Sequence, residues 1–191
     1  MTGKTVHGNL SLGTTSLIFK QNMNQEILIP PEYKELSGPS IFLAGPIQGA
    51  PDWQAEAIEI LKKISSVVHI TSPRRPARAL GEFSEKDYHG QVEWEHHYLD
   101  YAAEHGVILF WLAKEAEQIA GRAYAQTTRF ELGEAIARHY LKGIKVVVGI
   151  EKGFSNERYL RKTIKEKAPN VPMLNTLEDT CRVAVKTISA I

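Results

Sequence analysis

Short apolar runs that alternate with longer helix-like segments restrict the fold of this chain more than any other feature. The runs lie at residues 41–44, 67–70, 107–112, 146–148 and 171–174. Parallel neighbours in a sheet need crossover connections of helical length, and strands that are buried on both faces are continuously apolar. The pattern predicts an α/β fold of the flavodoxin-like or Rossmann-like type. We expect a three-layer sandwich around a five-stranded parallel sheet with the order 2-1-3-4-5.

The segments between these runs carry helix signals. Pro51 and Asp52 open the first helix, and its apolar positions are spaced for one buried face: Trp53, Ala57, Leu61 and Ile64. Further helices are predicted at residues 91–104, from Thr127-Thr128 to about 141, at 156–167 and at 178–188. Gly143 suits the left-handed position that ends the third of the five helices.

The first 38 residues lack this regular pattern. Two apolar bursts, Leu17-Ile18-Phe19 and Ile27-Leu28-Ile29, stand among polar residues, and Pro30-Pro31 ends the second. We expect residues 1–38 to form an N-terminal arm with one or two edge strands, in contact with a neighbouring subunit. Residues 39–191 then form the α/β domain.

Charge and cysteine content narrow the class of protein. The net charge of +1 shows no bias toward nucleic acid polymers or membranes and so favours a small-molecule or protein ligand. Cys181 is the only cysteine, which excludes an internal disulfide and fits a reducing compartment. The N-terminus lacks the apolar run of a signal peptide, and the longest apolar stretch, 107–113, is far shorter than the roughly 20 residues of a membrane helix. We expect a soluble cytoplasmic protein.

In a sheet of this order, ligands bind at the carboxyl ends of the first and third strands. Gly45-Pro46-Ile47-Gln48-Gly49 follows the first strand. It is either a tight turn or a loop whose backbone N–H groups approach a ligand closely. It lacks the Gly-Lys-Ser/Thr ending of a Walker loop and the G-x-G-x-x-G pattern, so no nucleotide cofactor of those kinds is expected.

The segment Thr127-Thr128-Arg129-Phe130-Glu131-Leu132-Gly133-Glu134 opens the helix after the third strand. In one interpretation Thr128 and Glu131 form a capping box, in which the carboxylate reaches back to the Thr128 N–H. In the other, Glu131 points into the ligand site from the first helical turn, where the helix dipole keeps it ionised and nucleophilic. Glu134 precedes Arg138 by one turn and is predicted to pair with it at the surface.

The helix before the third strand contains Gln91-Val92-Glu93-Trp94-Glu95-His96-His97-Tyr98. Gln91, Glu95 and Tyr98 share one face, which either lines the ligand site or is half exposed. The adjacent histidines point about 100° apart and H-E-x-x-H is absent, so no metal site is expected.

Two further features have alternative interpretations. Arg74 and Arg75 either hold an anionic group or lie in a solvated loop. Trp111 either stacks on a planar ligand or fills the core.

Taken together, these segments resemble the nucleoside 2-deoxyribosyltransferase-like family over roughly residues 40–190. The matching stretches are Ile41–Pro46, Gln91–Glu95 with Val107–Trp111, and Thr127–Glu134, in which Glu-Leu-Gly is the most specific element. The resemblance implies cleavage of the N-glycosidic bond of a nucleoside or nucleotide, with Glu131 as the nucleophile that forms a glycosyl-enzyme intermediate. It also implies a homodimer or larger homo-oligomer and no cofactor.

The sequence departs from the family at two places. Relatives commonly carry an aspartate acid/base at a position that falls at or near Tyr98, and Glu95, one turn earlier, is the candidate replacement. Pro46 and Gln48 stand where relatives that act on monophosphates carry serine and arginine, which leaves Arg74 or Arg75 to hold any anion. The expected substrate-binding residues are Gly45, Pro46, Gln48, Gln91, Tyr98, Trp111 and Thr128. The alternatives are a nucleotide-binding or sensing module without turnover, and a structural protein in which Glu131 is only a cap.

Overall fold

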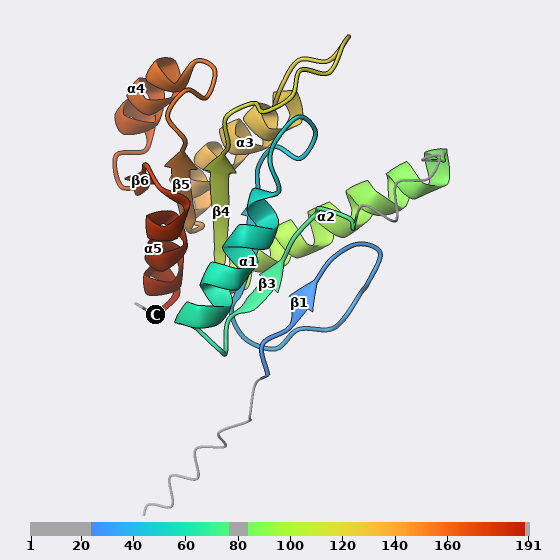
Figure 1. Ribbon diagram of the computed structural model, residues 1–191. Coiled ribbons are helices and arrows are strands. Elements are labelled where there is room, and N and C mark those ends of the chain that lie inside the picture. The colour runs from blue at the N-terminus through green and yellow to red at the C-terminus, as the bar shows by residue number, and fades with distance from the viewer. Residues whose placement is uncertain (1–23, 77–83, 190–191) are drawn as a thin grey trace, which may run out of the picture.

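A parallel sheet forms the centre of the protein, as the computed structural model shows (Figure 1). The structure describes residues 24–76 and 84–189. Within these ranges the sheet has six strands in the order β1-β3-β2-β4-β5-β6. The strands are β1 (Ile27–Leu28), β2 (Ser40–Ala44), β3 (His69–Thr71), β4 (Val107–Leu112), β5 (Val146–Ile150) and β6 (Met173–Leu174).

The predicted fold class and strand order are confirmed, with one strand more than the five predicted. The additional strand, β1, pairs in parallel with β3 at the sheet edge, with Ile27 opposite Ile70 and Leu28 opposite Thr71. It corresponds to the second apolar burst of the N-terminal region. The first burst, Leu17-Ile18-Phe19, lies outside the described residues.

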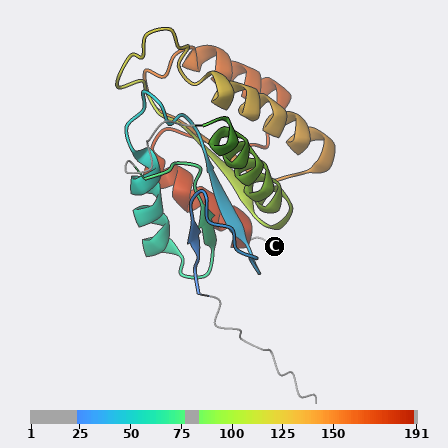
Figure 2. The same cartoon turned by 90° about the vertical axis from the view of Figure 1, so that its right-hand side faces the viewer.

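Helices cover both faces of the sheet (Figures 1 and 2). One face packs against α1 and α5, and the other packs against α2, α3 and α4. The helices are α1 (Trp53–Ile64), α2 (Glu85–His105), α3 (Gln126–Lys142), α4 (Glu157–Lys167) and α5 (Leu177–Ser189). None of the helices within the described ranges combines the length and apolar composition needed to cross a bilayer.

Several helix boundaries match the sequence signals and two do not. Asp52 caps α1 by accepting a hydrogen bond from the Ala55 N–H at 3.1 Å, and Gly143 ends α3 with φ 72°. However, α2 begins six residues before the predicted start, because residues 84–90 are all exposed and carry no apolar periodicity. Helix α3 begins at Gln126, before the predicted cap Thr128.

Residues 24–38 pack closely onto α2. The Trp94 indole donates a hydrogen bond to the Glu32 carbonyl at 2.7 Å. The Tyr101 hydroxyl lies 2.8 Å from the carbonyl oxygen of Gly38. Because Trp94 is fully buried, the described part of the N-terminal region belongs to the same folded body as the sheet.

Candidate functional site

The loops after β2 and β4 are in direct contact at the carboxyl edge of the sheet. The Gly49 carbonyl accepts hydrogen bonds from the backbone N–H groups of Ala116 and Glu117, at 2.8 and 3.1 Å. Gly49 has φ 75°, and a Cβ there would lie 2.7 Å from the Glu117 carbonyl oxygen. Glycine is required at this position by both its conformation and its surroundings.

The glycine at the end of β2 is required by packing inside the protein. A Cβ on Gly45 would lie 2.4 Å from the Trp111 carbonyl oxygen and 2.6 Å from the Trp53 ring. The Pro46 carbonyl accepts the Trp53 indole N–H at 2.8 Å, and Pro46 itself is buried. These contacts favour the tight-turn interpretation of the loop, in which Gln48 is exposed and Pro46 is buried.

Trp111 lies in the core rather than on the surface of a pocket. Its side chain is 5% exposed and belongs to the apolar cluster beneath α1 and α5. Its ring lies so close to Gly149 that a Cβ there would be 2.4 Å away. The structure favours the core-filling alternative, and we leave Trp111 out of the proposed site.

Helix α3 positions Glu131 differently from both sequence interpretations. The N-cap is Ala125, with φ 56° and no side-chain cap, so Thr128 and Glu131 do not form the predicted capping box. Thr128 is instead buried within the first turn. Glu131 falls in the second turn, beyond the unpaired N–H groups that concentrate the dipole's charge.

The Glu131 carboxyl is largely buried and lacks a hydrogen-bond or ion-pair partner among the described residues. Burial raises the pKa of Glu131 to about 7, with further increases from the nearby charges of Glu95 and Glu134. The prediction that the helix dipole keeps this group ionised is therefore wrong. Glu131 is half-buried by its exposed surface, and a partly desolvated carboxyl with a raised pKa beside two other carboxyls is typical of functional sites.

Glu95 projects from α2 and is held by a hydrogen-bond chain. The Gln91 side-chain N–H donates to the Glu95 carboxylate at 2.6 Å and to the Pro73 carbonyl at 2.9 Å. The Gln91 side-chain oxygen accepts from the Arg75 Nε–H at 2.5 Å. Burial raises the pKa of Glu95, whereas the Gln91 hydrogen bond and the charges of His96 and Arg75 oppose the increase. Gln91 thus fixes the orientation of Glu95.

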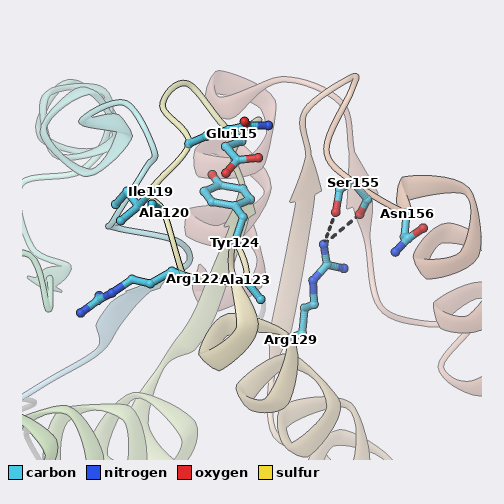
Figure 3. Close-up of a pocket in the computed structure, with 10 residues that line it drawn as sticks. Glu115, Ile119, Ala120, Arg122, Ala123, Tyr124, Arg129, Ser155 and Asn156 are labelled. Atoms are coloured by element: carbon cyan, nitrogen blue, oxygen red, sulfur yellow. Dashed lines mark hydrogen bonds between the residues drawn. The ribbon is translucent and has the colours of Figure 1, made fainter.

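The described cavity lies on another part of this edge, between the loops that precede α3 and α4 (Figure 3). It has a volume of about 670 Å³ and is open to solvent. Neither Glu131 nor Glu95 lines it. Its residues include Glu115, Arg122, Tyr124, Arg129, Ser155 and Asn156.

A sequence model of the family described as nucleoside 2-deoxyribosyltransferase like matches residues 38–154. The chain belongs to this family. A search of the curated proteins found no match. The matched range contains Glu95 and Glu131, the two carboxyls that interact between α2 and α3.

Tyr98 of this nucleoside 2-deoxyribosyltransferase-like protein is engaged inside the fold. It is fully buried, and its hydroxyl accepts the Lys34 N–H at 2.7 Å and lies 3.1 Å from the Lys34 carbonyl oxygen. Of the three residues predicted to share one face, Gln91 and Glu95 are half-buried, whereas Tyr98 is not accessible to a ligand. Tyr98 anchors the N-terminal region instead.

Arg74 and Arg75 are both engaged inside the protein. Arg74 donates to the side-chain oxygen of Gln54 at 2.9 Å and lies 3.4 Å from the Asp52 carboxylate. Gln54 is a buried amide, 1% exposed, that the sequence analysis missed because one buried amide on an apolar helix face gives no periodic signal. Among the described residues, no group of three or more His, Cys, Asp or Glu side chains could hold a metal ion.

Proposed function

We propose that the protein cleaves or transfers at the N-glycosidic bond of a (deoxy)nucleoside or nucleotide, with Glu131 as the nucleophile and Glu95 as the acid/base. The observation that supports this most directly is the pairing of two largely buried carboxyls across α2 and α3, of which only Glu95 has a hydrogen-bond partner. Family membership supports the nucleoside substrate class and an enzymatic role.

The chemistry needs one proton shared by the pair. In the singly protonated pair the charge of Glu95 keeps the proton on Glu131, so this proton first passes to Glu95. The Glu131 carboxylate then attacks the anomeric carbon, the bond to the base nitrogen breaks, and Glu95 donates that proton to the leaving base. Glu95, now ionised, takes a proton from water or from an acceptor base, which attacks the same carbon and releases Glu131. Because two close carboxyls titrate as a unit, the singly protonated pair is the active form.

The remaining expected substrate-binding residues fall into two groups. Thr128 lies on α3, the helix that carries Glu131, whereas Gly45, Pro46 and Gln48 belong to the loop after β2, where the Gln48 side chain is exposed. Gln91 acts through Glu95, which makes it a positioning residue. We propose no sugar or base contact for Tyr98 or Trp111.

Chromatographic detection of free base from a panel of nucleosides and nucleotides tests this function, with and without an acceptor base. Glu131→Gln should abolish base release, and intact-protein mass spectrometry of the native chain should detect an added glycosyl mass. Glu93→Gln, an exposed change on α2, is the matched control and should retain full activity. Full base release by Glu131→Gln would refute the role of Glu131.

A second candidate, a nucleotide-binding module without turnover, is favoured by one observation. The family aspartate falls at or near Tyr98, whose hydroxyl is already bound to Lys34. Saturable nucleotide binding in calorimetry without base release across the panel would support this module and contradict the enzyme.

A further inference from the structure

The cavity between the loops that precede α3 and α4 has the size of a small-molecule site. Its volume of about 670 Å³ lies within the range of ligand pockets in proteins, which is roughly 300–1,000 Å³. Neither glutamate of the proposed reaction site lines it. Arg129, which does line it, stands two positions before Glu131 on α3, so the two side chains point about 160° apart around the helix. The cavity and the proposed reaction site therefore lie on different sides of α3.

Arg129 brings a positive charge to the cavity that no carboxylate among the described residues neutralises. Its Nη2 donates hydrogen bonds to the Ser155 hydroxyl at 2.7 Å and to the Ser155 carbonyl at 3.0 Å (Figure 3). Its guanidinium carbon lies 4.6 Å from the centre of the Phe154 ring. These contacts hold the side chain, while its Nε–H and Nη1–H groups have no hydrogen-bond partner in the described part of the chain. Burial lowers the pKa of Arg129, as expected for a guanidinium without a counter-ion.

Two helices begin beside this cavity, and neither start is capped by a side chain. The N-cap of α3 is Ala125 and that of α4 is Asn156, and no side-chain cap hydrogen bond is present at either. The cavity-lining residues Tyr124 and Ser155 directly precede these two caps. The first N–H groups of a helix lack partners within it and carry the positive end of the helix dipole. Together with Arg129 they favour an anion, and phosphate oxygens fit both a guanidinium and backbone N–H groups.

Another wall of the cavity carries a hydrogen-bond acceptor and an aromatic ring. Glu115 lines the cavity and makes no hydrogen bond or ion pair with another described residue, so its carboxylate is available to accept hydrogen bonds. The Tyr124 hydroxyl donates to the Ala113 carbonyl at 2.7 Å, which fixes the ring in the wall (Figure 3). A ligand of this wall supplies hydrogen-bond donors, as the hydroxyl groups of a sugar do. We propose that the cavity is a second ligand site, which binds a sugar phosphate with its phosphate at Arg129 and the two helix starts and its hydroxyl groups at Glu115.

Isothermal titration calorimetry of the full-length chain with ribose 5-phosphate tests this site. The probe has no base, so its binding does not depend on the proposed reaction. The wild type should bind it saturably and more tightly than ribose or inorganic phosphate alone. Arg129→Gln should weaken binding about tenfold or more, because a hydrogen bond between charged groups is lost. Arg158→Gln removes an exposed arginine from the first turn of α4 that does not line the cavity, and this control should bind as the wild type does.

A second variant separates loss of binding from loss of folding. Asn156→Asp puts a negative charge at the cap of α4, where an acidic side chain favours the helix, so the chain should stay folded yet bind the probe about tenfold or more weakly. Glu131→Gln should leave the affinity unchanged, because Glu131 does not line the cavity. Competition by uridine 5′-monophosphate in Glu131→Gln, where no base is released, distinguishes a nucleotide from a free sugar phosphate as the source of this group.

Three results would overturn the proposal. The first is the absence of binding to the wild type, or binding no tighter than that of inorganic phosphate. The second is unchanged affinity in both Arg129→Gln and Asn156→Asp. The third is affinity that is lost in Glu131→Gln, which would assign the sugar phosphate to the reaction site. Since binding is measured rather than base release, failure here is distinct from failure of the proposed function.

Discussion

Replacing Glu131 with glutamine should stabilise the folded chain, and the gain should grow with pH. In the folded protein, burial and the charge of Glu95 raise the pKa of Glu131 from 4.5 to about 7. The folded state therefore holds this proton more tightly than the unfolded state does. A group of this kind contributes stability below its unfolded pKa and loses that contribution as the pH rises through its folded pKa.

The size of the effect follows from the shift. A change from 4.5 to about 7 corresponds to about 3 kcal/mol of free energy, at about 1.4 kcal/mol for each pH unit. The ionised carboxylate should therefore lower the free energy of unfolding by about 3 kcal/mol at pH 8 and by about 1 kcal/mol at pH 5. Glutamine has nearly the same shape and cannot ionise, so the variant avoids this loss.

Urea denaturation of the wild type and of Glu131→Gln from pH 5 to pH 8 measures the difference directly. Any effect of the new amide that does not depend on pH cancels when the differences at the two ends are compared. Glu93→Gln, an exposed carboxylate on α2, should show no comparable pH dependence. A Glu131→Gln variant that is equally or less stable at pH 8, with a difference that does not change with pH, would refute the argument that Glu131 is a buried, unpartnered carboxylate.

Further results are expected for the reaction and for stability. For base release, kcat/KM should fall above a pH of about 7, because the carboxyl pair then lacks a proton for the leaving base. Glu95→Gln should slow the cleavage of natural nucleosides far more than that of nucleosides with activated leaving groups. Equal slowing of both would contradict the role of Glu95 as the acid. Gln91→Leu removes the hydrogen bond to the Glu95 carboxylate and should lower kcat/KM roughly 10-fold to 100-fold. This is the equivalent of about 1.5–3 kcal/mol, the usual contribution of a hydrogen bond to a charged group. Unchanged kinetics would exclude a positioning role for Gln91. Gly45→Ala should lower the free energy of unfolding by about 1–3 kcal/mol in denaturant titrations, since the added methyl overlaps two tryptophan residues; a neutral result would mean that the loop can move. Tyr98→Phe should lower the free energy of unfolding by about 1 kcal/mol, because the partly buried Lys34 N–H loses its acceptor, with kcat unchanged in steady-state assays. A drop in kcat would return this residue to the site.

The sheet could be predicted because its signal is local and strong. The apolar run Val107–Leu112 matches the observed β4 exactly, and all six of its residues are buried. The strand order followed from the need for crossover helices and from the switch-point rule. β1 was anticipated only as an edge strand of an arm, because its two residues give no periodicity that would assign them to this sheet.

The start of α3 could not be predicted from local rules. Thr128 and Glu131 satisfy the capping-box pattern, yet the Ala125 carbonyl accepts the Arg129 N–H at 3.0 Å and the helix begins earlier. Ala125 adopts a left-handed conformation that alanine disfavours. The adjacent Tyr124 is anchored by its hydroxyl to the Ala113 carbonyl at 2.7 Å. This tertiary contact, which spans 11 residues, fixes the chain in a way that no local pattern reveals.

The electrostatics of the candidate site were equally hidden from the sequence. The dipole argument for Glu131 considered only its own helix, whereas its pKa depends on burial and on Glu95 of α2. The link from Arg75 through Gln91 to Glu95 joins a loop to a helix 16 residues away along the chain. Such groups become neighbours only once the layers of the fold have packed.

The packing of residues 24–38 against α2 has a practical consequence for anyone who shortens this chain. The family match begins at residue 38 and ends at 154, but the indole of Trp94 and the hydroxyl of Tyr98 find their partners upstream of it, at Glu32 and Lys34. Helix α5, which shields one face of the sheet, lies downstream. A fragment cut to the matched borders would expose aromatic and aliphatic surface at both ends and aggregate on expression. The stretch that sequence likeness marks out is thus smaller than the body that packs around the sheet.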